Sequence, residues 1–227
     1  LFFFKKELNE IVEEKETIIE EFVEPPEVYE EVKEEEKIED MKIDFAKLKQ
    51  TNKDIVGWMV FNNKYINNPL VQTTDNEYYL NHSFKNKENS VGAIFMDYRN
   101  ASWEDKNVVL FGHHTPNNTM FGSLSDVFKK EFFDTENADI IYIFDTNHNL
   151  RKYQIFSYYV IESEEYYITT SFGSTKDYQE FLKTIKSRSY GNRGVNVTTN
   201  DKILTLSTCA GPHGTTRRRV IHAKLIK

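Results

Sequence analysis

The residues best suited to chemistry lie near the end of the chain, around its only cysteine, Cys209. Cys209 ends a β-type run, and after a Gly/Pro loop three consecutive arginines, Arg217, Arg218 and Arg219, lead into another. A thiolate is a good nucleophile, and a nearby cation favours it over the thiol and can stabilise an oxyanion. The pattern therefore fits an acyl-transfer site, although a lone cysteine is most often a small buried hydrophobe.

A histidine far upstream could supply the second half of such a site. His113 follows the apolar run Asn107–Phe111 and enters a polar loop. Paired with a cysteine, its imidazole could protonate a leaving amine and deprotonate an incoming nucleophile. Spacing alone leaves open the alternative of a surface-loop histidine, because only the fold can bring His113 and Cys209 together.

The elements that must position these residues are mostly short β-type runs. An amphipathic helix is expected over 175–188, and shorter helical segments near 45–49, 75–80 and 121–130. Strands with few helices between them favour antiparallel pairing, and hence a barrel or a sandwich. The expected strands cover residues 54–61, 65–72, 91–97, 107–111, 139–144, 150–161, 195–197, 203–206 and 220–226.

The composition supports one sizeable domain with an appendage. The chain has 227 residues, of which 39% are hydrophobic and 14% aromatic. A single cysteine excludes an intramolecular disulfide framework, and the histidines do not have metal-ligand spacing, so no metal and no other cofactor is expected. The absence of a Gly-x-Ser-x-Gly sequence disfavours a serine hydrolase.

Charge divides the chain into two parts. The formal net charge is −7, but residues 1–40 hold 16 acidic and 5 basic residues, whereas the remainder has a net charge of +4. We interpret 1–40 as an acidic helical stalk or linker, and 41–227 as the globular domain. The apolar start of the chain could be the tail of a removed membrane anchor or a frayed helix start. The sequence has no arginine-rich aromatic platform of the kind that would suggest nucleic acid as a partner.

Several stretches of the sequence form a recognisable set: Asp54-Ile-Val-Gly-Trp58, Asp75-Asn-Glu-Tyr-Tyr-Leu80, Gly112-His113 with Met120-Phe121-Gly-x-Leu124, Thr205-Leu-Ser-Thr-Cys209, and Arg-x-Val-Ile-His222-Ala. In these stretches, and in their order along the chain, the sequence resembles class B sortases. The resemblance implies a mainly β fold, an eight-stranded barrel with N-terminal helices and a helix before the penultimate strand.

The resemblance also implies a function, with 41–227 as the catalytic domain. Class B sortases are cysteine transpeptidases, anchored in the membrane on the outer face of Gram-positive cells. They cleave a C-terminal sorting signal of the Asn-Pro-x-Thr type after Thr, hold a thioacyl intermediate on cysteine, and pass the acyl group to a peptide amine of the cell wall. The implied partners are surface proteins with sorting signals, the peptidoglycan amine, and the membrane through an N-terminal anchor.

Roles carry over to individual residues of this chain. Cys209 corresponds to the nucleophile and His113 to the general acid/base. The family pattern places the catalytic arginine four residues before His222, which selects Arg218 for stabilisation of the oxyanion or substrate, with Arg217 and Arg219 as alternatives. His114 is expected to be a loop side chain, and His213 is a second candidate base.

Two residues are expected to contact substrate. Ser207 lies two residues before Cys209, so both side chains face the same side of a strand. Its hydroxyl could equally bond neighbouring backbone. Tyr167 lies in a region that lines the substrate groove of relatives.

Two other functions remain open at this point. The same residues could form a thiol hydrolase that uses water as acceptor, or the chain could be a non-catalytic surface β-barrel whose cysteine is buried. The first differs from a transpeptidase in whether an amine outcompetes water. The second predicts a thiol that reacts only after denaturation.

Overall fold

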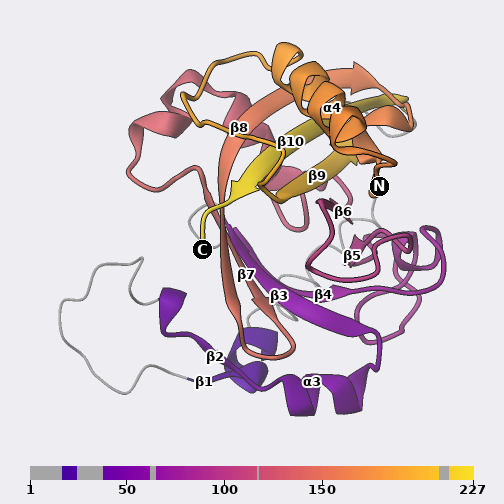
Figure 1. Ribbon diagram of the computed structural model, residues 1–227. Coiled ribbons are helices and arrows are strands. Elements are labelled where there is room, and N and C mark those ends of the chain that lie inside the picture. Colours follow the sequence, from indigo (N-terminus) through magenta and orange to yellow (C-terminus); the bar gives the residue numbers. More distant parts are fainter. Residues whose placement is uncertain (1–16, 25–37, 62–64, 117, 210–214) are drawn as a thin grey trace.

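The fold is a closed β-barrel. The computed structural model describes residues 17–24, 38–61, 65–116, 118–209 and 215–227. Within them, eight strands close into a barrel in the order β10-β8-β7-β3-β4-β5-β6-β9 (Figure 1). The strands are β3 (Ile55–Phe61), β4 (Ile66–Val71), β5 (Ile94–Met96), β6 (Asn107–Phe111), β7 (Ile140–Asp145), β8 (Leu150–Glu162), β9 (Ile203–Cys209) and β10 (Arg217–Leu225).

Most neighbouring strands are antiparallel, but β4 pairs with β5, and β6 with β9, in parallel. Alternate side chains of each strand point inward, and the barrel is filled by apolar residues such as Met59, Ile143, Leu206 and Ile221. The expected mainly β fold with an eight-stranded barrel is confirmed. The parallel β6–β9 pair matters most for function, because both strands lead to candidate catalytic residues.

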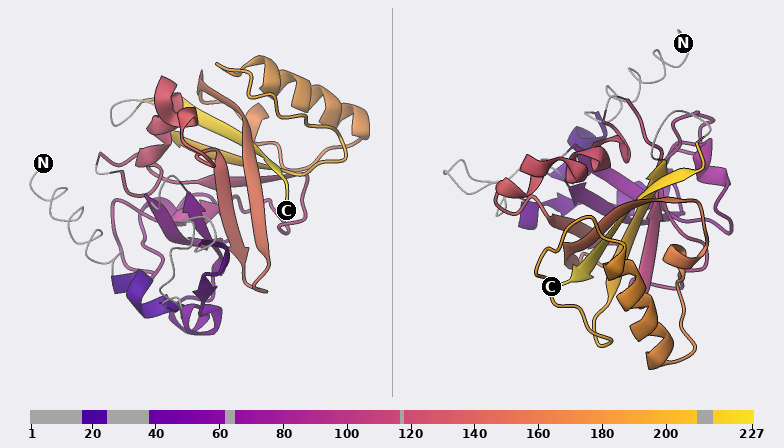
Figure 2. Two further views of the ribbon diagram at one scale, coloured as in Figure 1. Left: turned by 90° about the vertical axis from the view of Figure 1, so that its left-hand side faces the viewer. Right: turned by 90° about the horizontal axis from the view of Figure 1, so that it is seen from above.

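Helical segments lie outside the barrel. The α-helix α3 lies beside the short pair β1–β2 at one end of the molecule, and α4 lies at the other (Figure 2). The helix before the penultimate strand is α4, as expected. The elements are β1 (Val23–Glu24), β2 (Lys42–Ile43), α3 (Phe45–Thr51), α4 (Thr175–Ser187), and the 3₁₀ segments η1 (Tyr78–Leu80), η2 (Gly122–Phe128), η3 (Lys130–Asp134) and η4 (Tyr166–Ile168).

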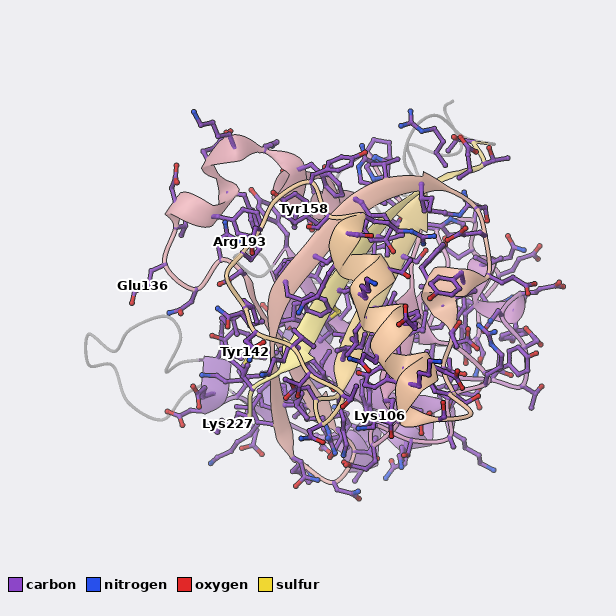
Figure 3. The ribbon with its side chains drawn as sticks, turned by 45° about the horizontal axis from the view of Figure 1, so that its top comes forward. Lys106, Glu136, Tyr142, Tyr158, Arg193 and Lys227 are labelled. Carbon is purple, nitrogen blue, oxygen red and sulfur yellow. The ribbon has the colours of Figure 1, made fainter. Side chains whose placement is uncertain are left out.

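The helix α4 covers the outer face of β8, β9 and β10 (Figure 1). Ser174 caps its first turn, accepting a hydrogen bond from the Asp177 backbone N–H at 3.2 Å. Four side chains of α4 itself, at helical spacing, are buried: Tyr178, Phe181, Leu182 and Ile185. At one end of the helix, Lys106 lies over the Tyr178 ring at 5.4 Å (Figure 3). The predicted amphipathic helix is thus confirmed.

The prediction of a strand at 195–197 is wrong. Val195 and Val197 pack under α4, but this segment joins no sheet. Lysine side chains bond its carbonyls instead. Lys186 Nζ donates to Val197 O at 3.2 Å, and Lys224 Nζ donates to Asn196 O at 2.8 Å. The apolar alternation here reflects burial without strand pairing.

The N-terminal part packs on the barrel where the structure describes it. Ile18, Phe22 and Ile38 are buried in one cluster with Trp58 of β3. Glu39 forms ion pairs with Lys152 and, at 2.7 Å, with Lys227 near the end of the chain. Much of 1–40 lies outside the described residues, so the expected stalk and the boundary near residue 40 stay predictions.

The expected location at the cell membrane needs a correction. Among the residues described here, the structure contains no helix that combines the length and the apolar character needed to cross a membrane. The sequence-based localisation rested on an N-terminal anchor at the apolar start of the chain, and the start itself, 1–16, lies outside the described residues.

Candidate active site

The parallel pair β6–β9 brings the two halves of the candidate site to the same end of the barrel. Phe111 of β6 is level with Ser207 of β9, and the Gly112 N–H donates to Ser207 O at 3.4 Å. His113 and Cys209 each lie two residues beyond this matched pair. His113 and Cys209 therefore both follow the same end of this strand pair.

Gly112 lets the chain leave β6 in this direction. A Cβ at this position would lie only 2.9 Å from the Phe121 ring, which is fully buried in the barrel. Any side chain here would push against Phe121, so glycine is the residue that allows the close approach. His113 then emerges half-buried at the barrel end.

On the other side of β9, β10 supplies the arginine. Arg218 is the antiparallel partner of Cys209, and Val220 is the partner of Ser207. Directly paired residues of neighbouring strands point to the same face of a sheet. Arg218 and Val220 therefore share the face of Ser207.

The three strand ends line one open cleft of about 510 Å³. This volume is within the range typical of ligand sites. Four of the five predicted site residues, His113, Ser207, Tyr167 and Arg218, line it, and Thr208, which precedes Cys209, lines it too. The remaining lining residues are Asn76, Leu80, Phe95, Phe111, Gly112, Ser163, Glu164, Glu165 and Ile168.

His113 is held by a backbone carbonyl. Its Nε2 lies 2.8 Å from Leu80 O, at the end of η1. A carbonyl oxygen can only accept, so Nε2 carries the proton and donates it. In the neutral ring Nδ1 is then the unprotonated nitrogen, which leaves Nδ1 as the atom that can exchange a proton.

Tyr167 and Ser207 form a buried pair in the wall of the cleft. The Tyr167 hydroxyl and Ser207 Oγ are 3.0 Å apart, and their exposed fractions are 2% and 3%. The Ser207 hydroxyl thus bonds a tyrosine, whereas one alternative from the sequence was a bond to neighbouring backbone. Packing of Tyr167 against Val220 and Tyr159 fixes η4 on β10.

The three arginines have different environments. Arg218 lines the cleft, and its Nη1 donates to Thr215 O at 2.9 Å. Arg217 is exposed, and Arg219 lies on the other side of the strand with its guanidinium 5.9 Å from the Phe128 ring. Burial, and secondarily the charge of Arg217, lowers the pKa of Arg219. Of the three, only Arg218 lines the cleft.

His114, expected as a loop side chain, does not line the cleft. His114 is half-buried, and its Nδ1 has no hydrogen-bond partner within the described structure. Burial, and then the charge of Arg219, lowers the pKa of His114. His213 and its loop, 210–214, lie outside the described residues.

Sequence reasoning missed the Leu80 carbonyl and the acidic rim. Leu80 belongs to one of the matched stretches, but a backbone acceptor leaves no signature in residue type. Glu164 at the rim is already paired, since Arg188 Nη1 lies 2.5 Å from its Oε1. Neither the Leu80 carbonyl nor the acidic rim can be found from helical spacing or a sequence motif. Both depend on loops whose paths are set by tertiary packing.

The arrangement supports nucleophilic acyl transfer. Cys209 ends β9, which lies between β6 and β10. The strand β6 leads to His113, whose Nδ1 is available, and β10 carries Arg218 at the position paired with Cys209. Together these groups can attack a carbonyl, stabilise the resulting oxyanion and transfer protons.

Comparison with known proteins gives one consistent family. The Sortase domain family matches residues 63–226. Sortase B of Staphylococcus aureus is 40% identical over 185 residues, which cover 81% of this chain and 75% of that protein. The crystal structure of sortase B from B. anthracis in complex with AAEK1 has a TM-score of 0.80 at 34% identity, with 100% of each chain covered. A crystal structure of sortase B complexed with triglycine has a TM-score of 0.75 at 40% identity, with 81% of this chain and 86% of that chain covered.

Proposed function

The chain belongs to the sortase family and is a class B sortase, which makes it a cysteine transpeptidase. On this premise we propose that it joins proteins with an Asn-Pro-x-Thr-like sorting signal to a cell-wall peptide amine. The observation that carries the proposal is the convergence of β6, β9 and β10, which lead to His113, Cys209 and Arg218, on one cleft.

In the first half-reaction the Cys209 thiolate attacks the carbonyl carbon of the Thr in the signal. The Arg218 guanidinium stabilises the oxyanion that forms. The Thr C–N bond then breaks, and protonated His113 gives its Nδ1 proton to the leaving amine. The acyl group remains on Cys209 as a thioester.

In the second half-reaction an acceptor amine attacks the thioester carbonyl. His113 takes a proton from this amine through Nδ1, a new amide bond forms, and the Cys209 thiolate leaves. Both half-reactions use the same nitrogen of the imidazole, because Nε2–H is engaged by Leu80 O throughout. The enzyme returns to its starting protonation state.

Ser207 and Tyr167 are proposed to contact the signal peptide. Both line the cleft beside Arg218, and their mutual hydrogen bond presents them as one rigid unit. Apolar walls contributed by Phe95, Phe111 and Ile168 suit a proline-containing segment.

The acceptor is proposed to be an amine at the end of a short peptide. A related sortase B has been solved complexed with triglycine, which makes this peptide the appropriate first probe. Water is the competing acceptor, and its use would make the protein a thiol hydrolase.

Mass spectrometry of the full chain with an Asn-Pro-Gln-Thr-type peptide, with and without triglycine, tests the proposal. We expect an acyl–triglycine product that Cys209→Ala abolishes. Hydrolysis that triglycine never diverts would replace transpeptidation by the hydrolase function. Product formation by Cys209→Ala, or a wild-type thiol that reacts only after denaturation, would overturn the catalytic assignment.

A further inference from the structure

The position of the Leu80 carbonyl matters for catalysis through the proposed role of His113, on which this inference rests. Two of the matched sequence stretches, 54–58 and 75–80, meet in the structure at a buried hydrogen-bond network of Asn52, Asp54 and Tyr79. We propose that this Asn52–Asp54–Tyr79 network is the positioning device of the acid/base. By fixing the carbonyl of Leu80, it sets the tautomer and the rotation of His113.

The network is centred on the Tyr79 hydroxyl. This hydroxyl donates to Asp54 Oδ2 at 2.8 Å and accepts from Asn52 Nδ2 at 2.7 Å, with Asn86 Oδ1 as a longer second acceptor at 3.2 Å. A phenol with its donor and acceptor sites both engaged has a fixed orientation. Burial, with Asp54 acting in the same direction, raises the pKa of Tyr79, so the hydroxyl keeps the proton that it donates.

Asn52 ties the network to the start of β3 and to the loop after η1. Its Oδ1 accepts from the Asp54 backbone N–H at 2.9 Å, and its Nδ2 also donates to Phe84 O at 2.7 Å. Asn52 and Tyr79 are 3% and 1% exposed. Water therefore has little access to replace these bonds, and the loss of one leaves a buried polar group unpaired.

The chain after η1 closes the network from the other side. The Ala93 N–H donates to Tyr79 O at 3.0 Å. Gly92 has φ +65°, and a Cβ on it would lie 2.3 Å from Tyr79 O and 2.9 Å from Leu80 O. The carbonyl of Leu80 is thus confined between a side-chain network and a closely packed backbone.

This confinement has a consequence for the chemistry. With Leu80 O fixed, the His113 ring is held with Nε2–H toward it and Nδ1 turned away. If the carbonyl moved, the ring could rotate or adopt the other tautomer, and the protons would then be exchanged at the wrong nitrogen. Asn52, Asp54 and Tyr79 do not line the cleft, so they act only through Leu80.

The test compares Tyr79→Phe with Tyr178→Phe as a matched control. Tyr178 is also buried, and its hydroxyl also bonds two oxygens, Lys106 O and Asp201 O, but it belongs to the buried face of α4 and does not line the cleft. The first readout is the His113 tautomer, from ¹⁵N chemical shifts of histidine-labelled full chain without substrate, assigned with His113→Gln. The second is kcat and KM for triglycine transpeptidation, normalised to the folded fraction.

We expect Tyr79→Phe to change His113 from the Nε2–H form to a mixture of tautomers, and to lower kcat about fivefold at unchanged KM, as for one lost hydrogen bond. Asp54→Ala should act alike, whereas Asp54→Asn, which keeps an acceptor oxygen, should retain most activity. Tyr178→Phe should leave both readouts at the wild-type values.

An unchanged tautomer in both Tyr79→Phe and Asp54→Ala would overturn the inference, as would equal losses in Tyr79→Phe and Tyr178→Phe. Since the tautomer is measured without substrate, it separates this inference from the proposed function. Full activity of His113→Gln would reject the function, while the tautomer would still report on the network.

Discussion

Arg218 on β10 lies directly opposite Cys209 on β9 in the antiparallel register. Its two neighbours in sequence do not share this relation to the cleft, because Arg217 is exposed and Arg219 lies near Phe128 on the other side of the strand. Three chemically identical side chains are thus separated by the alternation of one strand. Function should separate them in the same way.

Replacement of Arg218 by alanine should lower kcat/KM for transpeptidation by about 10²–10³-fold, as expected for the loss of an oxyanion donor. Arg217→Ala and Arg219→Ala should each cost less than about tenfold, because neither guanidinium lines the cleft. Steady-state kinetics with the sorting peptide and triglycine would measure all three variants. A larger loss in Arg217→Ala or Arg219→Ala than in Arg218→Ala would contradict the assignment.

The sequence was sufficient for the strands that carry the site. Periodicity located most strands and α4 closely, and resemblance supplied the closed barrel. The choice of Arg218 over its neighbours followed from the family pattern and a strand period of two, and the structure places Arg218 alone of the three in the cleft. These features are local, since residue type and spacing alone determine which face a side chain occupies.

The features that sequence reasoning missed depend on contacts between distant segments. Strand-like alternation at 195–197 came from packing under α4, where lysines bond the carbonyls that a sheet would have used. Leu80 was matched as part of a stretch, but nothing in its side chain indicates that its carbonyl holds His113. Backbone acceptors and the pairing of β6 with β9 become visible only when the fold is assembled.

Tyr167 and Ser207 should behave as a coupled pair. Ser207→Ala and Tyr167→Phe should each raise KM for the peptide, because each removes one partner of the buried 3.0 Å bond that holds the two side chains in the cleft wall. The coupling energy in a double-mutant cycle should be about 0.5–1.5 kcal/mol. Cycle energies from kcat/KM and from urea unfolding would check it. Strictly additive effects would show that the two side chains act independently.

Gly92→Ala should impair both stability and catalysis, whereas Gly194→Ala should impair stability alone. Both glycines have positive φ, +65° and +70°, so both substitutions strain the backbone by about 1 kcal/mol or more. Only at Gly92 would the added Cβ meet the carbonyls of Tyr79 and Leu80, since nothing lies within 4 Å at Gly194. Unfolding curves and kcat, measured on folded protein, would compare them. Equal kcat in the two variants would argue against steric control of Leu80.

A buried histidine outside the cleft should make stability depend on pH. His222 of β10 is fully buried, between strands β8 and β9. The Tyr159 hydroxyl donates to its Nε2, and its Nδ1–H donates to Thr205 Oγ1, each at 2.9 Å. The direction of the second bond is fixed, because Thr205 gives its own proton to Asn107 Oδ1 at 2.7 Å. The ring is therefore neutral in the folded protein.

Burial, and secondarily the charge of Arg188, lowers the pKa of His222 to about 3, from the ordinary value of 6.5. Between these values the unfolded chain binds a proton that the folded protein does not, so protonation favours unfolding. The contribution of His222 to the free energy of unfolding is fully present above the ordinary pKa. It should fall by up to about 1.4 kcal/mol per pH unit as the pH drops from the ordinary pKa toward the lowered pKa. Urea unfolding of wild type and His222→Gln across the range from about pH 7.5 to about pH 5 would separate this contribution from that of the carboxylates, which both proteins share. The variant should be less stable at the upper end of this range but lose less stability on acidification, and parallel curves for the two proteins would show that His222 is not the titrating group.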